Sequence, residues 1–280
     1  MTRAFTDKDI EAFKPAEKIG LVATVNPEGL PHVTLITSIM ACGPKQLTLG
    51  EFSKGKSKAH LQKNPKMAFL ILTMDRKIWR GRAVWTHLKT EGPEYETYNN
   101  IPMFRYNAYF GINTVHYLDL LETSGKKRLP LPGIILSTLM TRLAKTNFKR
   151  NDAGPVLKPF AERDIFNNLG ALKFMAWIGG DGFPTLVPAI QCQAADSGRL
   201  VLYGFPYGRD LAAIADNTPV AVFGLTMAME NVLVRGRFAR KPGFLGRPLA
   251  VIDIDWVYNS MPPCHGQIYP ETELLPITNF

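Results

Sequence analysis

A series of landmarks occurs twice along this chain at a nearly constant offset. In each copy an apolar run precedes a four-residue turn that ends in glycine, followed by one apolar residue and a proline, at Gly29 and Pro31 or at Gly182 and Pro184. Three more pairs follow in the same order: Leu47–Gly50 with Val201–Gly204, Asn64–Pro65 with Thr218–Pro219, and Arg80–Ala83 with Arg235–Phe238. Because the offset drifts only from 153 to 155 residues, the sequence predicts two copies of one module, at about residues 8–90 and 160–258.

Each copy consists of short β-rich runs bounded by turn residues, with one helical stretch in the middle. In the first copy the expected helix is Lys56–Lys63, and the expected strands are Lys18–Val25, Pro31–Met40, Lys45–Glu51, Lys66–Met74 and Lys77–Thr86. A few antiparallel strands with one short helix cannot cover both faces of an open sheet, so each copy is expected to close into a small barrel. The expected fold class is mainly β, with two tandem barrels.

A different segment, residues 91–162, separates the copies, so we expect domains at 1–90, 91–162 and 163–280. Its first part, Tyr95–Tyr117, is aromatic-rich without strand alternation and is expected to be irregular to helical. Residues 123–150 hold seven basic residues and no acidic one, with apolar residues at helical spacing from Ile134 to Leu143. This basic helix either packs its apolar face on its own domain, the favoured reading, or binds a membrane surface or nucleic acid.

Composition limits the partners and the compartment. The net charge is 33 − 24 = +9, which points to an anionic ligand or surface. Three widely spaced cysteines and five histidines without metal-ligand spacing predict no disulfide framework and no metal site. The start lacks the features of a signal peptide and no run is long enough to cross a membrane, so a cytoplasmic protein is expected.

Two local motifs could bind an anion. Between Leu49 and Pro65 a strand runs through a Gly/Ser/Lys turn into a helix, where free N–H groups and lysines suit a phosphate; a solvated basic turn is an equal alternative. Arg80-Gly81-Arg82 and its counterpart at 235–237 place two guanidinium groups on one face of a strand. These arginines are either ligand contacts or an exposed pair, and the repeated glycine favours a structural role for itself.

The order of hairpin, strand, Ser57-Lys58-Ala-His-Leu-x-x-Asn64-Pro65, apolar strand and x-Gly-Arg-Ala resembles the pyridoxamine 5′-phosphate oxidase-like FMN-binding split-barrel superfamily. The resemblance covers the first copy and, more loosely, the second. It implies split barrels paired as an internal pseudo-dimer, with FMN as the cofactor. The cofactor-binding residues it implies, together with the nearby candidate Arg80, are Thr37, Ser38, Glu51, Phe52, Ser53, Lys54, Lys56, Ser57, Lys58 and Arg80.

The resemblance also implies the function. We expect a flavoprotein oxidoreductase that acts on a small-molecule substrate, with a nicotinamide as a possible electron donor and a homodimer as a possible assembly. His32 and Thr37 stand where the classical oxidase has Arg and Lys, so we do not expect a true pyridoxamine phosphate oxidase. The alternatives are a non-catalytic flavin, haem or deazaflavin binding protein, and the membrane or nucleic-acid binder named above. The second copy has no lysine at the position of Lys58, so one flavin site per chain is expected.

Overall fold

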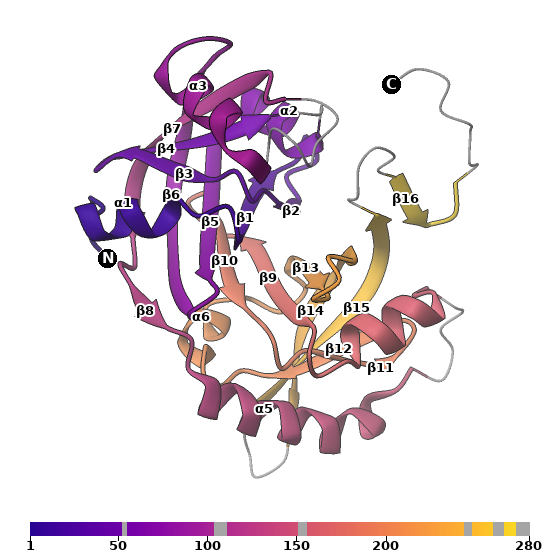
Figure 1. Ribbon diagram of the computed structural model, residues 1–280. Coiled ribbons are helices and arrows are strands. Elements are labelled where there is room, and N and C mark those ends of the chain that lie inside the picture. Colours follow the sequence, from indigo (N-terminus) through magenta and orange to yellow (C-terminus); the bar gives the residue numbers. More distant parts are fainter. Residues whose placement is uncertain (52–54, 104–110, 151–155, 244–247, 260–265, 273–280) are drawn as a thin grey trace. The chain divides into compact units, whose positions relative to one another are not determined.

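The computed structural model describes residues 1–51, 55–103, 111–150, 156–243, 248–259 and 266–272. The chain divides into two compact units, Met1–Leu129 with Ile178–Leu186 and Pro130–Trp177 with Val187–Phe280. Two eight-stranded antiparallel sheets form the framework (Figure 1). The protein is therefore mainly β, as the sequence predicts.

The first sheet has the strand order β2-β1-β5-β6-β7-β4-β3, and β8 pairs with β6. Its strands are β1 (Lys18–Val25), β2 (Pro31–Leu35), β3 (Met40–Gly43), β4 (Gln46–Glu51), β5 (Lys66–Thr73), β6 (Lys77–Lys89), β7 (Thr114–Thr123) and β8 (Lys127–Arg128). The helices of this part are α1 (Asp7–Phe13), α2 (Lys56–Lys63) and α3 (Pro93–Asn100).

A short link shows that this sheet is curled. The strands β2 and β3 lie at opposite ends of the strand order, yet only residues 36–39 join them. Six strand spacings in a flat sheet would separate them by about 29 Å, whereas this link reaches at most about 17 Å. The sheet therefore bends round into a barrel-like form, which confirms the expected closure.

The second sheet repeats the same order one module later. Its path is β10-β9-β13-β14-β15-β12-β11, and β16 pairs with β15. Its strands are β9 (Leu172–Ile178), β10 (Pro184–Pro188), β11 (Gln193–Asp196), β12 (Arg199–Tyr203), β13 (Pro219–Leu225), β14 (Asn231–Pro242), β15 (Pro248–Asn259) and β16 (Gly266–Tyr269). The helical elements of this part are α5 (Leu131–Ala144), η1 (Lys145–Phe148), η2 (Ala161–Phe166) and α6 (Gly208–Ala212). Matching orders in two sheets confirm the tandem repeat.

Several elements of the first copy lie where the sequence places them. Lys18–Val25 and Lys56–Lys63 have the expected bounds, and the helix ends at Asn64. The hairpin turn closes with the amide of Gly29 donating to the carbonyl of Asn26, at 3.0 Å, and Gly29 has φ +74°. A residue with a Cβ is strained at this φ, which explains the glycine.

Two expectations for the first copy are wrong. The run Pro31–Met40 is two strands, because the chain leaves β2 after Leu35 and enters β3 at Met40, at the other end of the sheet. The stretch Tyr95–Tyr117 is not free of strand, because β7 begins at Thr114. The first sheet therefore needs residues beyond 90, since β7 lies between β6 and β4.

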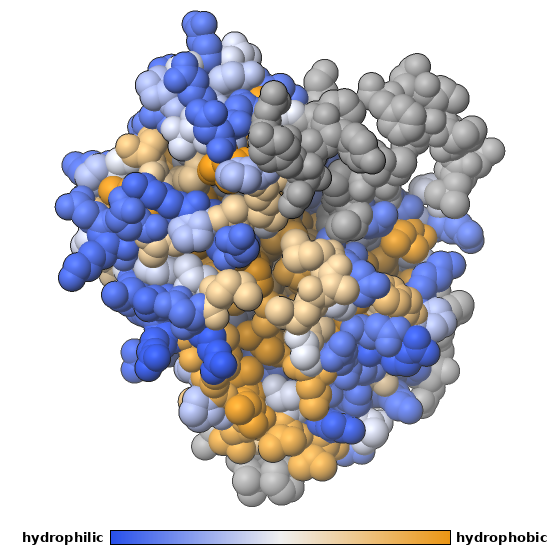
Figure 2. Space-filling model, in the orientation of Figure 1, coloured by the Kyte–Doolittle hydropathy of each residue, from blue (hydrophilic) through white to orange (hydrophobic). Residues whose placement is uncertain are grey.

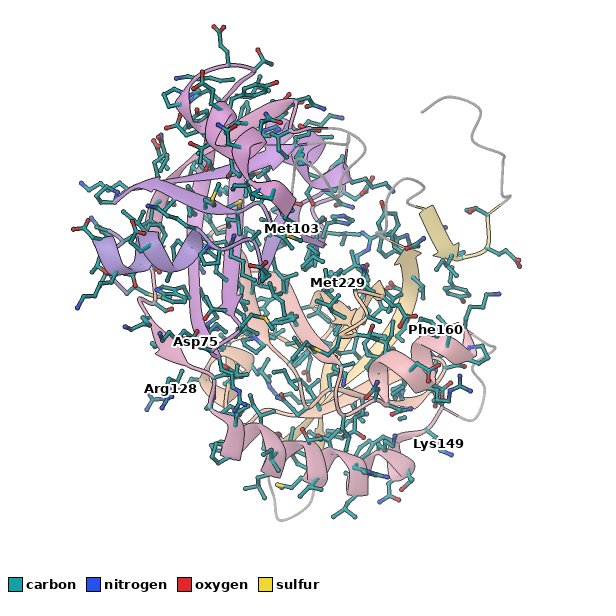
Figure 3. The ribbon with its side chains drawn as sticks, viewed as in Figure 1. Asp75, Met103, Arg128, Lys149, Phe160 and Met229 are labelled. Carbon is teal, nitrogen blue, oxygen red and sulfur yellow. The ribbon has the colours of Figure 1, made fainter. Side chains whose placement is uncertain are left out.

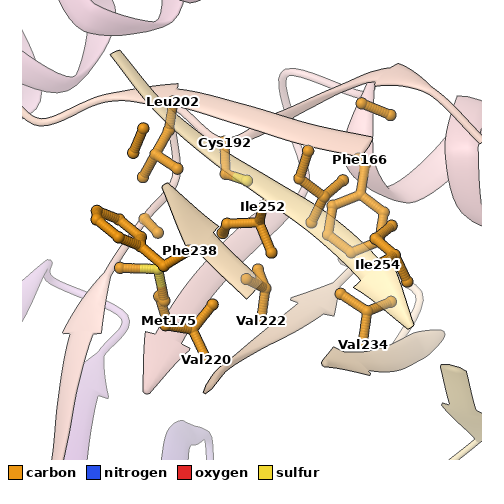
Figure 4. Close-up of a cluster of buried hydrophobic side chains, with 14 of the residues drawn as sticks. Phe166, Met175, Cys192, Leu202, Val220, Val222, Val234, Phe238, Ile252 and Ile254 are labelled. Carbon is orange, nitrogen blue, oxygen red and sulfur yellow. The ribbon is translucent and has the colours of Figure 1, made fainter. Parts of the chain in front are cut away.

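A separate core fills each sheet. In the first, Phe69, Trp79 and Leu118 belong to one buried cluster. In the second, Figure 4 shows Phe166, Met175, Phe238 and neighbouring aliphatic side chains gathered around Cys192. Of the cysteines, Cys192 is buried and Cys42 is exposed, and both are free thiols; Cys264 lies outside the described residues.

The glycine of each Arg-Gly-Arg motif allows two strands to approach closely. A Cβ on Gly81 would lie 2.2 Å from the carbonyl oxygen of Glu122 on β7. A Cβ on Gly236 would lie 2.2 Å from the carbonyl oxygen of Asp253 on β15. Both distances are too short for a real contact, so the structural role expected for the repeated glycine is confirmed.

Candidate functional site

The predicted anion site lies where β4 ends and α2 begins. β4 ends at Glu51, and α2 begins at Lys56. Ser57 and Lys58 are buried, 1% and 9% exposed, whereas Lys56 is exposed. The predicted site residues Phe52, Ser53 and Lys54 fall between these elements and lie outside the described residues.

Polar contacts hold the buried face of α2 against the sheet. The hydroxyl of Ser57 bonds to that of Thr34 on β2, and His60 Nδ1 lies 3.2 Å from Thr24 Oγ1 on β1. The ring of His32 packs edge-on against that of His60, with centroids 5.1 Å apart. His32 is therefore a buried packing residue, 4% exposed.

Burial and a carboxylate act on Lys58 in opposite directions. Burial disfavours the ammonium and lowers the pKa of Lys58, while the carboxylate of Glu51 raises it in part. A partly desolvated cation gains more from a bound anion than an exposed cation does, because fewer water contacts compete. Glu51, Ser57 and Lys58 therefore form one polar cluster, which we call the α2 cradle.

The α2 cradle has the chemistry of a phosphate site. The first turn of α2 contains no acidic residue, and Gly55 at the N-cap provides no capping side chain. N–H groups at a helix start carry partial positive charge and bind phosphate oxygens. With Lys58 and the hydroxyl of Ser57 this donor set fits the phosphate of FMN, and Lys56 adds an exposed positive charge.

A chain of two hydrogen bonds fixes the carboxylate of Glu51. The indole Nε1 of Trp85 on β6 donates to Nδ1 of His116 on β7, at 3.1 Å. An indole N–H only donates, so Nδ1 carries no proton and the imidazole hydrogen lies on Nε2. Nε2 then donates to Glu51 Oε2 at 2.6 Å. Glu51 thus accepts a hydrogen bond from the imidazole, which favours the carboxylate form.

The loop between β2 and β3 is held from two sides. Ser38 Oγ donates to the carbonyl oxygen of Gly50 at 2.9 Å and accepts from the amide of Gly50 at 3.1 Å. Tyr98 on α3 donates to the carbonyl oxygen of Ser38 at 2.6 Å, and its oxygen lies 2.9 Å from Thr48 Oγ1. The predicted contact Ser38 therefore lies beside the end of β4, next to the half-buried Thr37.

The structure does not bring Arg80 to the α2 cradle. Glu51 pairs with Thr114 at the start of β7, whereas Gly81, next to Arg80, pairs with Thr123 at its end. Nine residues of extended strand span about 30 Å. Arg80 lies near this far end of the sheet, where its backbone amide donates to Ser124 Oγ at 3.1 Å.

The second copy does not reproduce the charges of the α2 cradle. Gly204 corresponds to Gly50, so Phe205 occupies the position of Glu51. At the same offset, Ala212 occupies the position of Lys58. Leu249 occupies the strand position of His116, since each pairs with the residue before the shared glycine. In this copy Arg235 lies over the ring of Trp256, 3.8 Å from its centroid.

Residues 6–113 match the family model of pyridoxamine 5′-phosphate oxidase. These residues are similar to this family, and they include β1–β6 and α1–α3 of the first sheet. The matched residues include the α2 cradle, whereas His116 lies just beyond them. No curated protein sequence matches the chain.

Solved structures of several proteins are similar to part of the chain. An FMN-binding protein from Syntrophomonas wolfei subsp. wolfei is 16% identical over 44% of this chain and 86% of its own, with a TM-score of 0.37. HupZ of Group A Streptococcus is 18% identical over 42% of this chain and 91% of its own, with a TM-score of 0.35. An F420 reductase is 17% identical over 42% of this chain and 98% of its own, with a TM-score of 0.34.

Reasoning from sequence missed Trp85, Tyr98 and His116. His116 is a lone histidine in the sequence and shows no ligand spacing, and Trp85 stands 31 residues before it. Their contact depends on the pairing of β6 with β7, and β7 was not expected. The repeat itself held a signal for β7. The second copy ends in the strand-like run that forms β15, so the first copy should have an equivalent strand after residue 90.

Proposed function

We propose that the protein binds FMN through the α2 cradle and is an oxidoreductase acting on a small-molecule substrate. The observation that carries this proposal is the buried pair of Ser57 and Lys58 at an uncapped helix start. This pair lies within the residues that match the pyridoxamine 5′-phosphate oxidase family. Bound FMN supplies hydride or electron exchange at N5 of its ring system.

In this proposal the protein's own residues bind the phosphate of the cofactor and hold the cofactor in place. Lys58 and Ser57 bind the phosphate, and the helix start adds N–H donors. Burial lowers the pKa of Lys58, and Glu51, which accepts a hydrogen bond from His116, offsets part of that lowering. Thr37 and Ser38, beside the end of β4, are proposed to lie along the cofactor, and reducing equivalents are proposed to come from a nicotinamide.

The experiment compares Lys58→Met with Lys63→Met, an exposed lysine on the same helix. Loss of a charge-assisted contact of about 1.5–3 kcal/mol should weaken FMN binding by about 10- to 150-fold in Lys58→Met. Lys63→Met should bind FMN as the unmodified protein does. Flavin absorbance after gel filtration and titration with FMN measure both. Equal retention of FMN by the two variants, with unchanged circular dichroism, would exclude the cradle as the phosphate site.

The second candidate is a protein that holds a flavin, haem or deazaflavin without turning it over. This candidate is favoured by His32 and Thr37, which stand where the classical oxidase has Arg and Lys. Mass spectrometry of the released cofactor distinguishes the three groups. Anaerobic addition of a nicotinamide then distinguishes turnover from storage, because only an oxidoreductase using this donor reduces the bound group.

A further inference from the structure

The helix α5 contacts its unit through two polar side chains and a few apolar ones, and presents four large aliphatic side chains to solvent. Its buried residues are Ile134, Ser137 and Thr141. Ser137 Oγ donates to the carbonyl oxygen of Tyr203 on β12 at 3.2 Å, and the amide of Tyr203 donates to Thr141 Oγ1 at 3.1 Å. Met140 and Ala144 also pack against a buried cluster of the unit. The favoured expectation that the apolar face packs on its own domain therefore holds for one part of the apolar residues, and the other part faces outward.

The outward face of α5 is a continuous apolar stripe. Its large members are Ile135, Leu136, Leu139 and Leu143, which are 58%, 52%, 51% and 80% exposed. At 100° per residue these four fall within an arc of about 100°, opposite the buried face. Figure 2 shows apolar surface gathered where α5 lies in Figure 1. We call these four residues the α5 stripe.

The charges around the α5 stripe are all positive in the sequence. From residue 123 to residue 150 there are seven basic residues and no acidic one. Arg142 is an exposed neighbour of the stripe on the same helix, and Lys149 is exposed just after it. Figure 3 labels Lys149, which lies in the same unit as the helix.

We propose that α5 binds the surface of a membrane containing anionic phospholipids. A helix of this kind lies in the interface with its aliphatic side chains among the acyl chains and its cations among the headgroups. In the part of the chain that the structure describes, no helix is long and apolar enough to cross a membrane. The proposed mode is therefore attachment along one face.

Two other occupants fit these observations less well. A two-fold interface between copies of α5 would bring together two helices whose charged residue, Arg142, is basic in both, which disfavours pairing. A nucleic acid would match the charges, but exposed leucines gain little from a phosphate backbone. A lipid surface matches both the apolar stripe and the sign of the charges.

The experiment measures flotation of the full-length protein with vesicles. Vesicles of phosphatidylcholine with phosphatidylglycerol are compared with vesicles of phosphatidylcholine alone. The variant Leu139→Glu/Leu143→Glu changes the stripe, and Met227→Glu changes an exposed apolar residue elsewhere, 72% exposed. We expect binding to the anionic vesicles, a loss of more than about tenfold in the double variant and no loss in Met227→Glu.

A second readout does not depend on the folding of the double variant. A Leu139→Trp variant should show a blue shift of its added tryptophan emission, relative to the unmodified protein, when anionic vesicles are added. Three results would overturn the proposal: no flotation of the unmodified protein, equal flotation of the double variant, or no blue shift. Salt-sensitive binding of duplex DNA without vesicle binding would favour nucleic acid, and a stripe-dependent change in mass by light scattering would favour a second copy.

Discussion

Single residues in this protein are charged where the surroundings are apolar, and Lys173 is the clearest case. Its side chain is 1% exposed, and its Nζ donates to the carbonyl oxygen of Asn168 at 2.6 Å. The equivalent residue in the first copy is Gly20. The carbonyl oxygen of Lys173 accepts a hydrogen bond from the amide of Ala189, which follows β10, and the carbonyl oxygen of Gly20 accepts one from the amide of Ile36, which follows β2. One copy thus places a glycine where the other buries an ammonium group.

Lys173 should give the stability of the protein a measurable pH dependence. Burial lowers the pKa of Lys173 to about 8, from an ordinary value of 10.5. Between these values the unfolded chain binds more protons than the folded one, so the free energy of unfolding contributed by Lys173 rises with pH. The advantage of Lys173→Met over the unmodified protein should therefore shrink by roughly 2–3 kcal/mol from pH 8 to above pH 10.

Urea denaturation over this pH range measures the effect. The exposed Lys158→Met is the control, because its curve should run parallel to that of the unmodified protein. A Lys173→Met curve that also runs parallel would contradict the inferred burial of the charge.

At the scale of strands, the glycine of the Arg-Gly-Arg motif sets how closely β6 and β7 approach. Gly81→Ala would place a methyl group against the Glu122 carbonyl and 2.5 Å from the ring of Phe69. We expect a loss of roughly 1–3 kcal/mol in the free energy of unfolding, since overpacking forces neighbours to shift. Gly43→Ala on β3 is the control, because a Cβ there meets nothing within 4 Å. Equal stability of the two variants would show that the strands separate without cost.

The strands also show what the sequence could and could not reveal. β1 and α2 were predictable because each has a local pattern bounded by turn residues. β7 was not, because residues 90–113 separate it from β6, whereas only residues 243–247 separate β14 from β15. The hydrogen bonds from Trp85 to His116 and from His116 to Glu51 depend on β7, so this part of the candidate site could not be predicted without it.

For the whole molecule, the two copies share a fold but not a charge pattern. Only the first combines Lys58, Glu51 and His116, and the second has Ala212, Phe205 and Leu249 at these positions. The repeat in the sequence predicted the shared fold, since strand order follows from landmarks that both copies retain.

This asymmetry predicts one FMN per chain. Saturation of the protein with FMN, followed by removal of the excess, should leave about one flavin per polypeptide, because phosphate binding needs the donors at the start of α2. The ratio of flavin absorbance to protein concentration from amino-acid analysis measures this. A ratio near two would show that the second copy binds FMN by other residues.

The short link at residues 36–39 has a kinetic consequence. It joins the two ends of a sheet in which β7, an interior strand, is the last strand of the seven-strand order to be synthesised. β3 and β4 leave the ribosome early and pair with each other, but β4 pairs with its second strand only when residues 114–123 follow. Closure therefore waits for contacts distant in sequence, which makes folding slow relative to chains with local contacts. During synthesis the edge of β4 stays open longest, so a chaperone that protects the nascent chain has most to cover there.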